Sequence, residues 1–137
     1  MSSANCALVN RMIEEIQNRK NIALVDEIFA EDFLNHTPVR GISTDRAGMR
    51  QLFSMTHAAF PDGVVSIKDQ AASGDKVWTW KAFSGTHTGP LRDLAPTGNR
   101  VSYEVFDILR IRDGKIVEHW SLVDQLSLQR QLGIIRA

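Results

Sequence analysis

Apolar residues recur at helical spacing through the first sixty residues of the chain. One stripe, at i, i+3, i+4 and i+7, predicts an amphipathic helix with Asn5 or, alternatively, Ser3 as its N-cap. Residues 22–29 continue in a second short stripe, and a third helix is predicted between an N-cap at Thr44 and the turn at 61–63. The first stripe consists of Val9, Met12, Ile13 and Ile16.

The second half of the chain alternates apolar and polar residues with a period of two, which is typical of strands. Asp113-Gly114 is a strong hairpin signal between the last two runs, and residues 125–133 predict a short helix capped by Gly133. Helices followed by antiparallel strands indicate an α+β domain in which a curved sheet, covered by helices on one face, leaves a hollow for a ligand. The predicted strands cover residues 64–72, 76–87, 101–112 and 115–124.

Composition narrows the class of protein further. The 137 residues fit one domain spanning 1–137. Sixteen basic residues balance sixteen acidic ones, which argues against a nucleic-acid or anionic-membrane partner. No apolar stretch could span a bilayer, the start does not read as a signal peptide, and the single cysteine, Cys6, cannot form an internal disulfide. We therefore expect a soluble, cytoplasmic protein that binds a small molecule or another copy of itself.

An acidic residue, Asp107, interrupts the apolar row of its predicted strand. A buried carboxylate must be paired or must have a raised pKa, and a raised pKa suits a general acid or base near neutral pH. The alternative is that Asp107 lies in solvent at the mouth of the hollow or pairs with a structural arginine. The four histidines show no metal-ligand spacing and nucleotide motifs are missing, so we expect no metal and no cofactor. The row contains Val101, Tyr103, Val105, Asp107, Leu109 and Ile111.

His119 shares a face of the last strand with Ser121. A three-residue loop, 112–114, would set Asp107 opposite His119 and make an Asp–His proton-transfer pair, whereas a two-residue loop would set Asp107 opposite Trp120. His119 could equally be a hydrogen-bonded core histidine. The apolar row that points the other way predicts a homodimer across the outer face of the sheet. That outward row contains Phe106, Ile108, Trp120 and Leu122.

Several other residues are candidates for the pocket wall. Trp78 and Trp80 could form a flat aromatic wall or simply belong to the core, and Phe83 lies on the opposite face of their strand. His36 and His87 lie in predicted loops, where they could donate protons or only be solvated, and His57 is read as structural. The full set of candidate pocket residues is His36, Trp78, Trp80, His87, Tyr103 and Ser121.

The chain resembles the SnoaL-like polyketide cyclases, also called ester cyclases, of the nuclear-transport-factor-2-like superfamily. The segments that carry the resemblance span nearly the whole chain; they are AFPDG, SGDKVWTWKAFSGTHTG, APTGNRV and ILRIRDGKIVEHWSLVDQLSLQRQLG. The resemblance implies a cone-shaped, cystatin-like α+β barrel with N-terminal helices over a pocket, and dimers or tetramers formed through the sheet. It also implies closure of a polyketide-like ester by intramolecular aldol chemistry, with no metal or cofactor.

At one position of the expected site the chain departs from the family that it resembles. The family carries its acid/base aspartate directly after the tryptophan of E-H-W-D, whereas this chain reads E-H-W-S with Ser121 there. The matched position on the neighbouring strand, often histidine in the family, is Asp107, and Asp124 matches a recurrent family aspartate that is either functional or structural.

These residues favour an enzyme, with Asp107, His119 and Asp124 as catalytic candidates. A different reaction on the same fold, such as hydrolysis, dehydration or isomerisation, and a non-catalytic binding protein remain alternatives.

Overall fold

Helices form the N-terminal part of the chain, and the computed structural model describes residues 2–135. Helix α1 (Ser2–Arg11) continues into the π-helical segment η1 (Met12–Asn18), and a short 3₁₀ turn, η2 (Ile22–Leu24), leads to α2 (Val25–Ile28) and later to α3 (Arg46–Ala59). Two predicted caps are wrong. Because α1 already begins at Ser2, Ser3 and Asn5 lie inside it, and Asp45 rather than Thr44 caps α3. The Asp45 carboxylate accepts a hydrogen bond of 3.0 Å from the Gly48 amide, as an N-cap side chain should.

A five-stranded sheet follows, in the order β1-β5-β4-β3-β2. Adjacent strands of the sheet run antiparallel, except that β1 at one edge runs parallel to β5. The α+β prediction is therefore confirmed, and β1 is an additional strand that begins where the predicted helical stripe of residues 22–29 ends. The strands and the last helix are β1 (Phe29–Asn35), β2 (Val64–Ser73), β3 (Lys76–Thr86), β4 (Arg100–Arg112), β5 (Lys115–Val123) and α4 (Gln125–Gln131).

The hairpin between β4 and β5 has a register that neither prediction anticipated. Its turn has two residues, Asp113 and Gly114, both with positive φ (52° and 74°), which matches the twist of the flanking strands. Arg110 pairs with Glu118 while Ile111 pairs with Ile116, so Val117 is an extra residue. This bulge moves every later pair by one position. Asp107 consequently lies opposite Ser121, not opposite His119 or Trp120.

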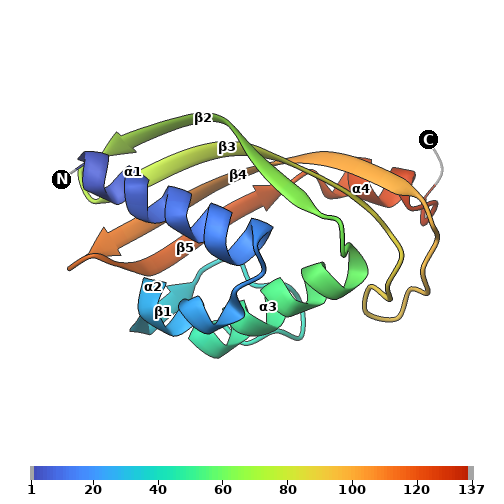
Figure 1. The fold of residues 1–137 in the computed structure, drawn as a ribbon, viewed down its shortest axis with the longest axis horizontal. Coiled ribbons are helices and arrows are strands. Elements are labelled where there is room, and N and C mark those ends of the chain that lie inside the picture. Colours follow the sequence, from blue (N-terminus) through green and yellow to red (C-terminus); the bar gives the residue numbers. More distant parts are fainter. Residues whose placement is uncertain (1, 136–137) are drawn as a thin grey trace.

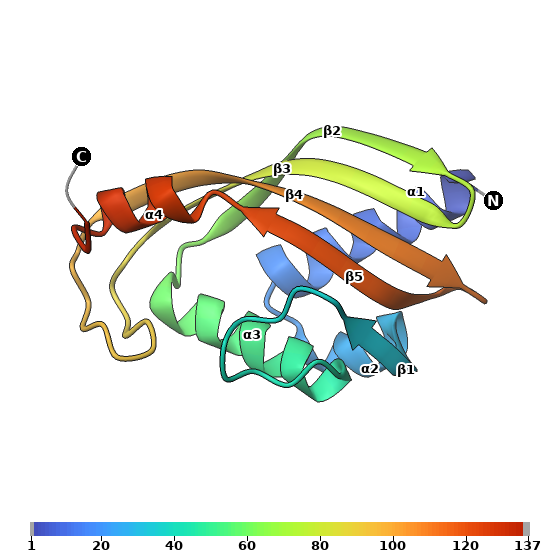
Figure 2. The same ribbon diagram turned by 180° about the vertical axis from the view of Figure 1, so that it is seen from behind.

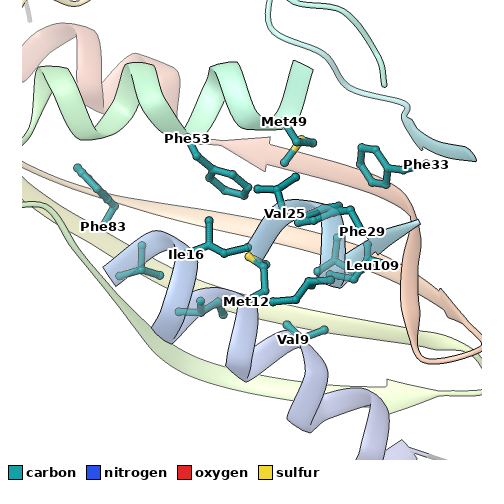
Figure 3. Close-up of a cluster of buried hydrophobic side chains, with 14 of the residues drawn as sticks. Val9, Met12, Ile16, Val25, Phe29, Phe33, Met49, Phe53, Phe83 and Leu109 are labelled. Atoms are coloured by element: carbon teal, nitrogen blue, oxygen red, sulfur yellow. The ribbon is translucent and has the colours of Figure 1, made fainter. Parts of the chain in front are cut away.

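The hydrophobic core fills the space between one face of the sheet and the helices. Figures 1 and 2 show the sheet arching over α1, α2 and α3, with α4 beyond the end of β5. Side chains of the N-terminal helix and of α3 meet in one cluster on this face of the sheet (Figure 3). We call this covered side the inner face. Fully buried side chains there include Val9, Ile16, Phe29 and Leu109.

The opposite, outer face of the sheet is apolar and uncovered in the single chain. Trp78, Phe106 and Leu122 are 48%, 52% and 74% exposed. Within residues 2–135, no helix is both long enough and apolar enough to cross a membrane. The outer aromatic face, as we name it here, consists of Trp78, Trp80, Phe106, Ile108, Trp120 and Leu122.

Candidate active site

A cavity of about 550 Å³ lies between the inner face of the sheet and the helices. That volume is in the range of small-molecule sites, which are mostly apolar with a few placed polar groups. Side chains from η1, α3, α4 and all five strands line it, so residues far apart in the sequence meet there. Its apolar wall includes Met12, Met49, Phe53, Phe83 and Leu109.

Asp107 and Lys81 form a buried ion pair in the cavity wall. The Asp107 Oδ2 atom lies 2.7 Å from the Lys81 Nζ atom, and the two side chains are only 3% and 7% exposed. They meet because Thr79 on β3 pairs with Asp107 on β4, which puts Lys81 on the same face two residues along. The Asp107 Oδ1 atom is buried without a hydrogen-bond partner among the described residues. One carboxylate oxygen is thus held by the ammonium and the other is free.

Gln17 supplies a second contact to Lys81. Its Oε1 atom accepts a hydrogen bond of 3.2 Å from the Lys81 Nζ atom. Gln17 lies in η1, directly after the buried Ile16, and π-helical segments are frequent at functional sites. The same segment receives a contact from α3, since the His57 Nε2 atom lies 3.2 Å from the Gln17 carbonyl oxygen. Burial lowers the pKa of His57, so this histidine is neutral at pH 7.

His119 has a different partner from the predicted one. Its Nδ1 atom lies 2.8 Å from the Asn35 Oδ1 atom, and that oxygen also accepts from the Thr37 amide at 3.0 Å. Since Asn35 Oδ1 is an acceptor, the His119 Nδ1 atom carries the proton and the Nε2 atom does not. Burial lowers the pKa of His119 to about 4, against the opposing effect of the nearby Asp107 charge. His119 is therefore a neutral side chain in the wall, and the predicted Asp–His hydrogen bond is replaced by the Asp107–Lys81 pair.

Two hydroxyl groups complete the polar part of the cavity. Burial raises the pKa of Tyr103 to about 12, so its phenol stays protonated at neutral pH. Ser121 lies opposite Asp107 across the hairpin, and its backbone amide donates a hydrogen bond of 2.8 Å to the Thr37 Oγ1 atom. Both hydroxyls are available to bind oxygen atoms of a ligand.

Four of the predicted pocket residues do not line this cavity. Trp78 and Trp80 point to the outer face, because residues of β3 alternate and Lys81 and Phe83 take the inner positions. His36 stacks on Trp120, with ring centroids 4.5 Å apart, and hydrogen-bonds Glu118 at 2.7 Å. The structure therefore places Trp78, Trp80 and His36 outside this cavity.

His87, the fourth, is fully buried beside Phe60, at 5.6 Å between ring centroids. Its Nδ1 atom accepts a hydrogen bond of 3.1 Å from the Thr97 amide, which ties down the loop between β3 and β4. A loop histidine was expected to be solvated or at the cavity mouth. It is instead an internal anchor of that loop.

Asp124, proposed as catalytic, caps the last helix. Its Oδ1 atom accepts a hydrogen bond of 3.1 Å from the Ser127 amide at the start of α4. The residues on either side of it, Val123 and Gln125, line the cavity and Asp124 does not. This cap is the structural alternative for Asp124, and the structure places its carboxylate outside the cavity.

The sequence reasoning missed Lys81, Gln17 and His57. Lys81 carried a usable signal, because it alternates with the two tryptophans in the same way that Asp107 alternates with Phe106 and Ile108. A charged residue in each of two adjacent inner rows, with opposite signs, indicates a buried pair. Gln17 and His57 carried no such signal, since both occupy ordinary helical positions.

The sequence of this chain is similar to those of known cyclases. The sequence profile of the SnoaL-like polyketide cyclases matches residues 7–132. The chain is 33% identical to the nogalonic acid methyl ester cyclase of Streptomyces nogalater over 114 residues, which cover 80% of this chain and 83% of the relative. It is 31% identical to the aklanonic acid methyl ester cyclase DnrD of Streptomyces peucetius over 136 residues, covering 96% and 92% of the two chains.

The fold agrees with these matches. The structure of TsrD from Streptomyces laurentii superposes with a TM-score of 0.87 and 26% sequence identity, and the match covers 97% of each chain. The family profile and the superposed fold each cover nearly the whole chain, and the chain belongs to the SnoaL-like polyketide cyclase family.

Proposed function

We propose that this chain closes a ring of a polycyclic aromatic ester by an intramolecular aldol reaction, with Asp107 as the general base. The observation that carries the proposal is the free Oδ1 atom of a buried carboxylate in the wall of a mostly apolar cavity of about 550 Å³. Two relatives are cyclases of nogalonic and aklanonic acid methyl esters, which supports a substrate of that class.

The reaction needs one proton to leave a carbon atom and return to an oxygen atom. Asp107 Oδ1 takes the proton from a carbon next to a carbonyl, and the electron pair of that C–H bond moves into an enolate. The enolate carbon then attacks a second carbonyl of the same molecule and forms the new C–C bond. The resulting alkoxide takes the proton back from Asp107, so the enzyme ends unchanged.

The position of Asp107 relative to the expected family aspartate also supports Asp107 as the base. By resemblance, the family aspartate lies at the position of Ser121, and Asp107 is the cross-strand partner of Ser121. Directly paired residues on one face have Cβ atoms about 4.5–5.5 Å apart. A carboxylate moved from one position to the other therefore remains at nearly the same place in the cavity.

Incubation of the purified chain with nogalonic acid methyl ester or aklanonic acid methyl ester tests this function. We expect the ester to be converted into a product of the same mass with one more ring, because the reaction only moves atoms within one molecule. Chromatography with mass detection separates the isomers. Release of methanol and a free acid would indicate a hydrolase, loss of water a dehydratase, and binding without conversion a ligand-binding protein.

We also propose that two copies pair through the outer aromatic face. Leu122 is 74% exposed and Phe106 is 52% exposed on this face, and contiguous exposed apolar residues often mark a protein–protein interface. Light scattering at micromolar concentration should give twice 15.4 kDa, and L122E should give one copy. L126E is the matched control, because Leu126 is 52% exposed on α4, away from this face. A monomer mass for the parent would contradict the dimer, and four times the mass would indicate a tetramer.

The setting that we propose for this chemistry is the cytoplasm, with a small hydrophobic or polyketide-like substrate. The free thiol of Cys6 and the balance of sixteen basic and sixteen acidic residues support it.

A further inference from the structure

Lys81 is a charged group whose surroundings do not use all of its donors. An ammonium group has three N–H donors. Among residues 2–135, the Lys81 Nζ atom has two acceptors, Asp107 Oδ2 at 2.7 Å and Gln17 Oε1 at 3.2 Å. Because the side chain is buried in the cavity wall, bulk water does not surround the third N–H. A donor without an acceptor among these residues therefore lies beside the carboxylate of Asp107, and both side chains line the same cavity.

The pair is unfavourable as a purely structural element. Removing two charges from water costs several kcal/mol for each ion, and well-packed apolar residues often stabilise a protein as much as the pair does. Here the Asp107 Oδ1 atom has no hydrogen-bond partner among the described residues, and one donor of the Lys81 ammonium has no acceptor among them. Such a free acceptor beside a free donor matches a substrate that gives up a proton and develops negative charge on a neighbouring oxygen.

We infer that Lys81 is a catalytic residue that donates a hydrogen bond to the enolate oxygen, while Asp107 holds the abstracted proton. The inference rests on the proposed aldol function. When Asp107 accepts the proton it becomes neutral, and the Lys81 charge is no longer balanced by its protein partner. The enolate oxygen then takes over the role of counter-ion, so the ammonium stabilises the intermediate more than the substrate.

A phenol that absorbs differently when ionised, 4-nitrophenol, tests this inference without turnover. Its phenolate mimics the enolate oxygen on an aromatic ring. The variant D107N mimics the enzyme just after proton transfer, because asparagine is neutral and similar in size to the protonated acid. Since D107N leaves the buried Lys81 ammonium without its carboxylate, circular dichroism first establishes that it is folded. In D107N we expect Lys81 to favour the bound phenolate over the phenol by about tenfold or more relative to D107N/K81M.

The double variant D107N/K81M is the reference that lacks the ammonium. It carries neither charge of the pair, so no ion is left buried without a partner and the chain should fold. The matched control is D107N/K76M, since Lys76 is on the same strand but lies over Trp120, at 5.4 Å from its ring centroid, on the outer face. This control should bind phenolate as D107N does.

The outcomes separate the two proposals. If D107N and D107N/K81M bind the same proportion of phenolate, Lys81 does not stabilise an oxyanion and the inference is overturned, even where the parent cyclises the esters. If phenolate binding depends on Lys81 but the parent converts neither ester, the oxyanion site stands and the substrate class proposed above fails.

Discussion

Replacing Asp107 by asparagine is expected to lower kcat for ring closure by about 10²–10⁴-fold, the usual effect of removing a general base. KM should change little, because asparagine keeps the size of the side chain and one acceptor oxygen. Steady-state kinetics with the cyclised ester as product measures both constants. Unchanged turnover in D107N would remove Asp107 from the reaction and favour a different base or a binding protein.

The same experiment extends across the hairpin. D107N/S121D restores a carboxylate at the cross-strand partner of Asp107, the position where the family carries it by resemblance. We expect this double variant to recover part of the lost rate. The recovery should be partial, because Lys81 is positioned to pair with a carboxylate on β4 and not with one on β5. S121D alone is the control for the effect of an added charge, and no gain over D107N would argue that the two positions are not interchangeable.

Replacing Lys81 by methionine is expected to lower the free energy of unfolding by about 3–5 kcal/mol at pH 7, because it strands a buried carboxylate. Both partners are less than a tenth exposed, so solvent cannot replace the lost ammonium. Urea denaturation followed by circular dichroism measures the change. The control K76M, on the outer face of the same strand, should change stability by no more than about 0.5 kcal/mol.

Adding D107N to K81M should return most of that stability. The double variant has no charge to strand, and replacing both members of a buried pair is often neutral or stabilising. A double variant as unstable as K81M would mean that the lysine acts mainly through packing of its aliphatic chain. Recovered stability combined with lost turnover would instead show that the pair is kept for chemistry at the expense of stability.

Most helices and strands of this fold could be predicted from the spacing of apolar residues in the sequence. The stripe through Val9 and Ile16 predicted the N-terminal helix, and the alternation through Leu109 predicted which residues of β4 face inward. Both predictions succeed because the side-chain periods of a helix and a strand are local properties of the backbone. The tail motif placed the chain in a family, and the family profile confirmed it.

The site was less readable, and two examples show why. Alternation separated Trp80 from Phe83 onto opposite faces of β3 but could not say which face the helices cover, so the tryptophans were placed in the pocket. Asp107 was correctly placed in the inward row, but its predicted partner was His119, and the bulge at Val117 moved the register. A bulge depends on how two strands fit together, which neither strand encodes alone.

The sequence by itself determined the helices and the four antiparallel strands that follow them, the inward position of Asp107 and the family, because each depends on neighbouring residues or on the chain as a linear pattern. Only the tertiary structure decided that Lys81 is the partner of Asp107, that Gln17 from the N-terminal helix contacts the same ammonium, and that Asp124 is a helix cap. These contacts join segments up to 64 residues apart. Their geometry is set by strand register and helix packing, which are global properties of the folded chain.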